Sequence, residues 1–235
     1  MKPFSIEKTW IYPNVRHWTA EILKNLEQVN KLYKNEDGVI LDVGGGLAPI
    51  SDITNISHYK YILIDPNVNS LKSAPEFIDK REGCGEDMPI SDDSVDIILT
   101  SSCLQYMDQA KFFDECKRVL KTGGLIAVHE NGSKNPIIIF ARLSQRVVGL
   151  FNKEHWYYRN TIKDYYYPKE IEGLKKLHVN RSGLLTPLML YLQVLKMKEP
   201  ENLYKYLLNI DNNLFKLLPY LRDFTFLNTV IYMKV

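Results

Sequence analysis

A short apolar run that ends in three consecutive glycines constrains the fold of this chain more than any other feature. The run covers residues 39–43, and Gly44, Gly45 and Gly46 follow it directly. An apolar run of this length predicts a buried parallel strand, and glycines at its end allow a sharp turn whose main-chain amides approach a ligand closely. Residues 41–50 therefore predict a strand-to-helix turn suited to a nucleotide-like ligand, with a tight turn that binds nothing as the alternative.

Further apolar runs alternate with segments of helical periodicity, which predicts an α/β fold. Residues 15–33 and 109–120 have the apolar spacing of amphipathic helices, and residues 61–65, 95–99 and 125–128 are short apolar runs typical of strands. The roughly 17 residues between the first two strands suit a crossover helix. Because strands and helices alternate, the sheet is predicted to be parallel and doubly wound.

After Asn131 the pattern changes, and the chain adds material to this core. Residues 135–151 have helical spacing, a Tyr-rich stretch follows at 155–167, and strands are expected at 177–184 and 226–233 with two helical runs between them. A chain of 235 residues is long enough for one α/β core with elaborations rather than two independent domains. We therefore expect a single domain over residues 1–235, with helical inserts at 133–167 and 186–222.

The composition excludes several classes of function. The formal net charge is +2 and no dense block of Lys or Arg occurs, so the basic surface of a nucleic-acid-binding protein is missing. Cys84, Cys103 and Cys116 have neither CxxC nor zinc-ligand spacing, and their odd number suits a reducing compartment. No apolar run reaches the roughly 18 residues of a membrane-spanning helix, and no signal peptide is recognisable. We expect a cytoplasmic protein that uses no metal and has no nucleic-acid partner and no transmembrane segment.

The residues around the glycines distinguish between nucleotide ligands. A dinucleotide fingerprint that began at Gly44 would need its last glycine at position 49, where Pro49 stands. Asp42, just before the glycines, would repel a pyrophosphate, whereas it would attract the cationic amine and sulfonium of S-adenosylmethionine (SAM). Asp65, at the end of the second strand, can accept hydrogen bonds from both hydroxyls of a ribose. The charges therefore favour SAM over a dinucleotide.

Four motifs follow one another along the chain. They are LDVGGG, LIDPN, EDMPISDDSVDIILTSSCLQYM and FFDECKRVLKTGGLIAVHEN. In this order they resemble the class I SAM-dependent methyltransferase family, in its UbiE-like small-molecule branch, and the resemblance covers about residues 15–131. It implies a doubly wound, mostly parallel, seven-stranded Rossmann-like methyltransferase sheet with helical lid inserts. It also implies SAM as the cofactor and S-adenosylhomocysteine as its product.

The same resemblance implies which residues hold the cofactor. They are Asp42, Gly44 and Gly46 for the methionine moiety, Asp65 with its neighbour Pro66 for the ribose, Glu86, Asp87 and Met88 for the adenine edge, and Ser101 and Gln105 for the amino-acid end. The chain departs from the family pattern at three places, the mildest of which is Ala48, where the family often has a third small residue or glycine. An Asp that commonly contacts the adenine amine aligns with Cys84, so we assign that contact to Glu86 instead. A His that is common in the fourth motif is replaced here by Gln105 or Tyr106.

The acceptor side offers three candidate general bases. Glu130 and His129 stand at the end of a predicted strand, where side chains face the ligand crevice of an open sheet, and His155 precedes the Tyr-rich stretch. Each of them is equally plausible as a structural or solvated residue. Methyl transfer from a sulfonium depends largely on positioning, so a base matters chiefly when the acceptor is a hydroxyl.

The inserts and their tyrosines favour a small-molecule or glycan acceptor. We predict O-methylation of a sugar, glycan or secondary metabolite, ahead of C-methylation of a quinone-like ring. A nicotinamide-dependent oxidoreductase and a non-catalytic SAM-binding module are the competing functions. The helix expected at 136–151 carries Arg142 and Arg146, and its apolar face is expected to pack on the core, with peripheral contact to a membrane surface as the alternative.

Overall fold

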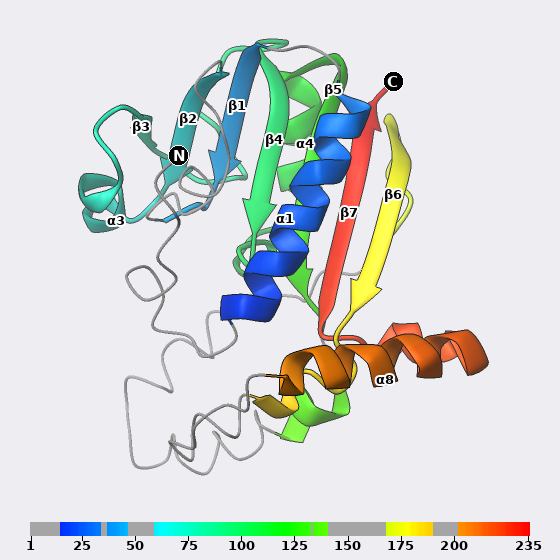
Figure 1. The fold of residues 1–235 in the computed structure, drawn as a ribbon. Coiled ribbons are helices and arrows are strands. Elements are labelled where there is room, and N and C mark those ends of the chain that lie inside the picture. The colour runs from blue at the N-terminus through cyan, green and yellow to red at the C-terminus, as the bar shows by residue number, and fades with distance from the viewer. Residues whose placement is uncertain (1–14, 34–36, 47–58, 133, 141–167, 190–201) are drawn as a thin grey trace.

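A seven-stranded sheet forms the centre of the structure. The computed structural model describes residues 15–33, 37–46, 59–132, 134–140, 168–189 and 202–235. Within these ranges the strands are β1 (Gly38–Val43), β2 (Tyr59–Asp65), β3 (Asp79–Glu82), β4 (Val95–Ser101), β5 (Leu120–Asn131), β6 (Leu174–Ser182) and β7 (Leu227–Lys234). Figure 1 shows helix α1 across one face of this sheet and α4 behind the other. In the described part of the chain, no helix has both the length and the apolar character needed to cross a membrane.

The strand order is β3-β2-β1-β4-β5-β7-β6. The first five strands of this order pair in parallel, whereas β7 runs antiparallel to both β5 and β6. The chain order reverses at β1, because β2 lies on one side of it and β4 on the other. In open α/β sheets, ligands bind beyond the carboxyl ends of the strands at such a reversal. The topology therefore points to the carboxyl ends of β1, β2 and β4 as the ligand edge.

The longer helices form where apolar residues recur at helical spacing. They are α1 (Val15–Leu32), α3 (Val68–Ser73), α4 (Gln109–Val119) and α8 (Leu203–Leu217), with 3-10 turns η2 (Leu104–Tyr106) and η3 (Pro219–Phe224). Helix α4 begins after Asp108, whose carboxylate accepts hydrogen bonds from the amides of Ala110 and Lys111. It buries one apolar face that includes Phe112 and Cys116. This face fixes α4 against the sheet.

The core consists of two apolar layers, one on each face of the sheet. Leu41 and Val43 of β1 belong to the layer that contains Phe112 of α4, whereas Ile40 belongs to the layer that contains Ile22 of α1. Side chains alternate along a strand, so neighbouring residues at a strand end face opposite layers. This alternation decides on which side of the sheet each polar residue of the ligand edge lies.

Most sequence-based expectations for the fold are confirmed. The expected strands and the helices at 15–33 and 109–120 are present with bounds that differ by a few residues, and α8 lies within the second expected insert. The expectation of a mostly parallel seven-stranded sheet is confirmed, and the exception is β7, which returns antiparallel between β5 and β6. Strand β3 was not expected, since its sequence, DKRE, has no apolar pattern at this sheet edge. The Tyr-rich stretch and most of the 136–151 helix lie outside the described residues.

The chain after β5 is tied to the β6–α8 region by buried polar side chains. Asn135 has no exposed surface, and its Nδ2 lies 3.2, 3.0 and 3.0 Å from the carbonyl oxygens of Gly183, Leu184 and Phe224. Asp211 of α8 is equally buried and accepts a hydrogen bond of 2.9 Å from the amide of Leu184. Three segments far apart in sequence therefore meet at these two side chains, beyond the sheet.

Replacing Asn135 is expected to destabilise the protein. In Asn135→Ala, buried carbonyls lose their donor, at a cost of about 1–3 kcal/mol in the free energy of unfolding. Asn135→Asp is the control, because its carboxylate still accepts from the amides of Ile137 and Ile138 but cannot donate to the carbonyls. Urea denaturation should show both variants to be destabilised, and an unchanged midpoint in both would contradict the proposed tie.

Candidate functional site

The glycine turn after β1 adopts a conformation that other residues rarely take. Gly44 has φ +69° and Gly46 has φ +57°, both in the left-handed region that favours glycine. The amide of Gly44 donates to the carbonyl of Ile64 at 2.8 Å, and a Cβ at Gly44 would lie 2.8 Å from the Cys103 side chain. A Cβ at Gly46 would meet no described atom within 4 Å. The turn is thus packed tightly against the protein at Gly44, and at Gly46 none of the described residues crowds it.

Asp65 connects this turn to the end of β2. Its side chain is mostly buried, with Oδ2 accepting from the Gly46 amide at 3.0 Å and Oδ1 accepting from the Asn67 amide at 2.7 Å. Each carboxylate oxygen has a second lone pair and can accept one more hydrogen bond. Asp65 therefore holds the glycine turn in place and keeps acceptor capacity for a ligand. Pro66, the next residue, is exposed at the same strand end.

Asp42 lies beneath the turn, on the α1 side of the sheet. A Cβ at Gly45 would overlap its carboxyl group, and Tyr61 donates its hydroxyl hydrogen to Oδ2 at 2.6 Å. Its other oxygen, Oδ1, has no hydrogen-bond partner among the described residues. Complete burial raises the pKa of Asp42 to about 7; the Tyr61 hydrogen bond opposes this effect and the nearby charge of Asp65 adds to it. A buried cationic group would lower this pKa again.

The residues expected at the adenine edge form a loop beside Asp65. The amide of Gly83 lies 3.5 Å from the Asp65 carbonyl, and Cys84 pairs with Asp87 in an isolated bridge. Met88 is buried, and Asp87 is exposed. The carboxylate of Glu86 accepts from the amide of Asp108, at 2.9 Å, and so contacts the start of α4.

The end of β4 brings polar groups to the same edge. Ser101, His129 and Thr229 are register partners on β4, β5 and β7, so they lie side by side on the sheet face that α1 covers. His129 and Thr229 are buried, and the Ser101 hydroxyl has no hydrogen-bond partner among the described residues. Gln105 is also buried, with its Nε2 donating to the Ser102 carbonyl at 3.2 Å.

Glu130 points to the opposite face and holds a main-chain turn. Its Oε1 accepts from the amides of Cys103 and Leu104 at 2.8 and 2.9 Å, which fixes the 3-10 turn that follows β4. Burial raises the pKa of Glu130 to about 7, although these amide hydrogen bonds act to lower it. Of the three candidate bases, Glu130 is thus hydrogen-bonded to the protein's own backbone. His129 lies in the row that it forms with Ser101 and Thr229, which we call the polar row, and His155 lies outside the described residues.

Two residues of the site were not predicted from the sequence. Tyr61 is the first buried residue of β2, and its sequence context predicts an ordinary core residue. In the structure its hydroxyl donates a hydrogen bond to Asp42. Cys103 was considered only as a thiol, yet its Sγ contacts the Val43 carbonyl at 3.1 Å and the Thr100 hydroxyl oxygen at 2.8 Å. A parallel register assigned in advance would have placed Tyr61 beside Ile40, on the same sheet face as Asp42, whereas no local signal marks Cys103. All three cysteines of the chain are free.

Comparison with known proteins agrees with this geometry. Residues 41–128 match the family model described as a methyltransferase domain. The matched segment begins in β1, ends in β5, and contains the glycine turn, Asp65 and the expected adenine-edge loop.

Two curated relatives are similar over part of their length. A protein of Mycolicibacterium vanbaalenii described as an uncharacterized methyltransferase is 32% identical over 92 residues, which cover 37% of this chain and 36% of that protein. A protein of Schizosaccharomyces pombe described as an uncharacterized methyltransferase-like protein is 25% identical over 124 residues, covering 51% of this chain and 48% of that protein. The alignments therefore span about a third to a half of these relatives.

Solved structures share the fold over almost the whole chain. The geranyl diphosphate C-methyltransferase of Streptomyces coelicolor, solved with Mg²⁺, geranyl diphosphate and S-adenosylhomocysteine, superposes with a TM-score of 0.55 at 14% identity, covering 92% of this chain and 78% of that one. A candidate sarcosine dimethylglycine methyltransferase of Galdieria sulphuraria gives a TM-score of 0.56 at 17% identity, covering 100% of this chain and 91% of that one. The sheet therefore has the Rossmann-like methyltransferase fold.

The buried carboxyl of Glu130 is expected to make stability depend on pH. The unfolded side chain ionises near its ordinary pKa of 4.5, whereas the folded one keeps its proton up to about 7, so the free energy of unfolding falls as the pH rises through this window. Glu130→Gln retains an oxygen for both amides and removes the charge. At about pH 8 it should be about 1–3 kcal/mol more stable than the wild type, and at about pH 5 equally stable.

Urea denaturation at both pH values checks this expectation. Glu130→Ala is the control, because it leaves the amides of Cys103 and Leu104 without their acceptor and should be destabilised at either pH. A Glu130→Gln variant that is less stable than the wild type at about pH 8 would contradict the assigned role.

Proposed function

We propose that this protein is a SAM-dependent methyltransferase that acts on a small molecule. The observation that carries the proposal is the pairing of Asp65 with the open glycine turn at the reversal of strand order, within the segment that matches the methyltransferase domain model. This pairing brings to one place closely packed main-chain amides and a carboxylate that could accept hydrogen bonds from a ribose. An Asp at the end of the second strand is suited to accept both hydroxyls of a nucleoside.

The residues of the edge fit SAM in several independent ways. A Cβ at Gly46 would meet no described atom within 4 Å. Asp65 can accept further hydrogen bonds, and Asp42 has a buried oxygen without a partner in the described part of the chain. Asp42 and Asp65 give the turn a negative character, which suits an ammonium and a sulfonium better than a pyrophosphate. When bound, SAM supplies an electrophilic methyl group on its sulfonium.

The protein's own residues would contribute mainly binding and orientation. Asp65 would hold the ribose, the turn of Gly44 to Gly46 would support the methionine moiety, and the loop of Glu86 to Met88 would lie along the adenine. Fixed geometry of this kind accounts for much of the rate of a displacement reaction, because the acceptor and the methyl group are brought into line. The polar row of Ser101, His129 and Thr229 lies at the same strand ends and would face the acceptor side.

For the acceptor, we propose a hydroxyl of a sugar, glycan or secondary metabolite. His129 would then accept the hydroxyl proton, since it is the candidate base that lies in the polar row, whereas Glu130 is engaged with two amides. The UbiE-like branch and C-methylation of a quinone-like ring form the alternative, for which no base of this kind is required. Peripheral contact with a membrane-held acceptor would remain compatible with either reaction.

Binding of S-adenosylhomocysteine to Asp65 variants tests the cofactor proposal. In isothermal calorimetry, the wild type should bind S-adenosylhomocysteine, and Asp65→Ala should bind about 10- to 100-fold more weakly because two hydrogen bonds to a charged acceptor are lost. Asp114→Asn is the control, since Asp114 is an exposed carboxylate on α4 that pairs with Lys117. A wild type that does not bind, or an Asp65→Ala variant that binds equally well, would overturn the proposal.

Methyl transfer to His129 variants tests the proposed base. With a hydroxyl acceptor found by screening with tritiated SAM, His129→Asn should lower kcat about 100-fold or more and leave the affinity for S-adenosylhomocysteine unchanged. An undiminished kcat would rule out His129 as the base, and the absence of transfer to any acceptor would favour a non-catalytic SAM-binding module.

A further inference from the structure

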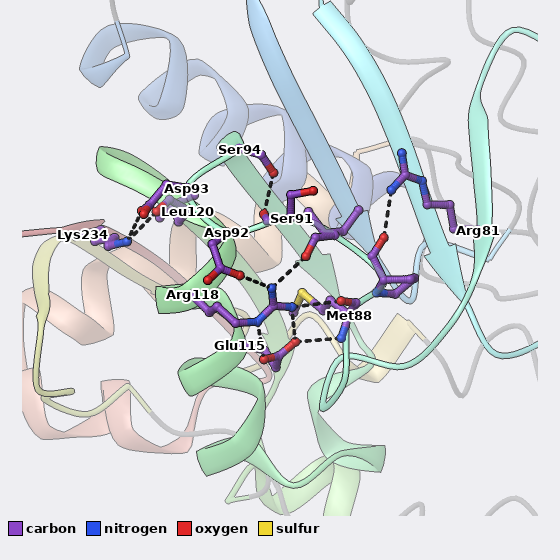
Figure 2. A network of polar contacts seen from close by, with 12 residues as sticks. Arg81, Met88, Ser91, Asp92, Asp93, Ser94, Glu115, Arg118, Leu120 and Lys234 are labelled. Atoms are coloured by element: carbon purple, nitrogen blue, oxygen red, sulfur yellow. Dashed lines mark hydrogen bonds and ion pairs between the residues drawn. The ribbon is translucent and has the colours of Figure 1, made fainter.

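Two arginines on opposite sides hold three consecutive carbonyl groups of the chain. Figure 2 shows Arg118 of α4 and Arg81 of β3 reaching residues 88–90, which start with the last residue of the expected adenine-edge loop. Arg118 donates to the carbonyls of Met88 and Ile90 at 2.9 and 2.7 Å, and Arg81 donates to the carbonyl of Pro89 at 2.8 Å. Residues 88–90 belong to no helix or strand. Side chains therefore supply the hydrogen bonds that secondary structure supplies elsewhere.

Arg118 uses all of its hydrogen-bonding capacity in this contact. Besides the two carbonyls, its Nε and Nη2 donate to the two oxygens of Glu115 at 2.7 and 2.6 Å, and its Nη1 donates to Asp92 at 2.6 Å. A guanidinium has five N–H donors in a fixed fork, and here each has an acceptor. Lysine cannot reproduce this arrangement, because its three donors radiate from one nitrogen.

Glu115 extends the contact to both ends of one residue. Its Oε2 accepts from the Met88 amide at 2.8 Å, while the Arg118 to which it is bound holds the Met88 carbonyl. The Arg118 hydrogen bond lowers the pKa of Glu115, which keeps its carboxylate charged. The Met88 amide is thus bound by the carboxylate and the Met88 carbonyl by the guanidinium. These two side chains lie about one helical turn apart on α4. We call Glu115, Arg118 and Arg81 the clamp.

The clamp adjoins the loop that lies beside Asp65. Residues 84–87 directly precede Met88, and the Gly83 amide approaches the Asp65 carbonyl. From the other side, a Cβ at Gly85 would lie 2.7 Å from the Met107 sulfur and 2.9 Å from Phe112, so the loop has no room to shift toward the core. Its position is set by this packing at one end and by the clamp at the other.

From this arrangement we infer that the clamp positions residues 84–87 as the platform for the adenine of the cofactor. Glu115, Arg118 and Arg81 would then be positioning residues that act through the loop and set cofactor affinity and base selectivity. The inference rests on the proposed function, because it assigns the base of SAM to this loop. A clamp that serves stability alone would change the thermal midpoint of its variants and leave their ligand affinity and selectivity unchanged.

The test compares Arg118→Lys with the wild type in ligand binding and in kinetics. We expect binding of S-adenosylhomocysteine to weaken about tenfold, equivalent to about 1.4 kcal/mol. We also expect KM for SAM to rise to a similar degree, with kcat at saturating SAM unchanged. The preference for S-adenosylhomocysteine over S-inosylhomocysteine, whose base has a carbonyl in place of the amino group, should fall as well, because a loosened loop reads the base edge less sharply.

Two further variants complete the experiment. Arg181→Lys is the matched control, since Arg181 also pairs with an aspartate, Asp223, but lies on β6 at the far edge of the sheet. It should leave affinity and selectivity unchanged. Arg81→Lys can keep its ion pair with Asp79 while losing the contact to Pro89, so it provides the same test with a smaller expected effect if Arg118→Lys does not fold.

The outcomes separate this inference from the proposed function. A wild type that does not bind S-adenosylhomocysteine would overturn the proposed function and the inference with it. If the wild type binds but Arg118→Lys or, where that variant does not fold, Arg81→Lys keeps the wild-type affinity and selectivity, only the clamp's role is refuted. Equal binding of the adenine and hypoxanthine nucleosides by the wild type would likewise overturn the assignment of this loop to the base.

Discussion

The hydrogen bond from the Gly46 amide to the Asp65 carboxylate is the contact on which the ligand edge depends. It joins the turn after β1 to the end of β2, and Gly46 itself has a left-handed backbone conformation that favours glycine. The same carboxylate organises the start of the next segment through Asn67. One side chain therefore fixes two turns, and each of its oxygens keeps a lone pair that can accept a further hydrogen bond.

Around this contact, buried carboxyl groups are stabilised by different means on the two faces of the sheet. Glu130 is compensated by main-chain amides, whereas Asp42 has one hydroxyl donor and one oxygen without a partner in the described residues. Burial brings the pKa of both to about 7. The difference in compensation gives them different parts: Glu130 holds the turn after β4 through two amide hydrogen bonds, and Asp42 has the capacity to respond to a cationic ligand.

The sequence predicted what local patterns encode. Apolar runs located the inner strands, and Gly44 to Gly46 located the turn, because both depend on short-range spacing. It did not predict β3, whose polar residues form an edge strand only because β2 offers it a partner, nor the antiparallel return of β7 beside β5. The candidate site residues were assigned by resemblance, whereas the hydrogen bonds of Glu130 to amides 26 and 27 residues away are tertiary contacts that no local pattern records.

The two sides of the ligand edge are built on different supports, which has a consequence for how the protein can vary. The proposed nucleoside side is fixed by ion pairs and carbonyl contacts within residues 79–118, whereas the region beyond β5 is held together by Asn135 and Asp211. None of these side chains belongs to both sets. Because interactions that share no partner contribute independently, we expect changes beyond β5 to leave the support of the proposed nucleoside side the same.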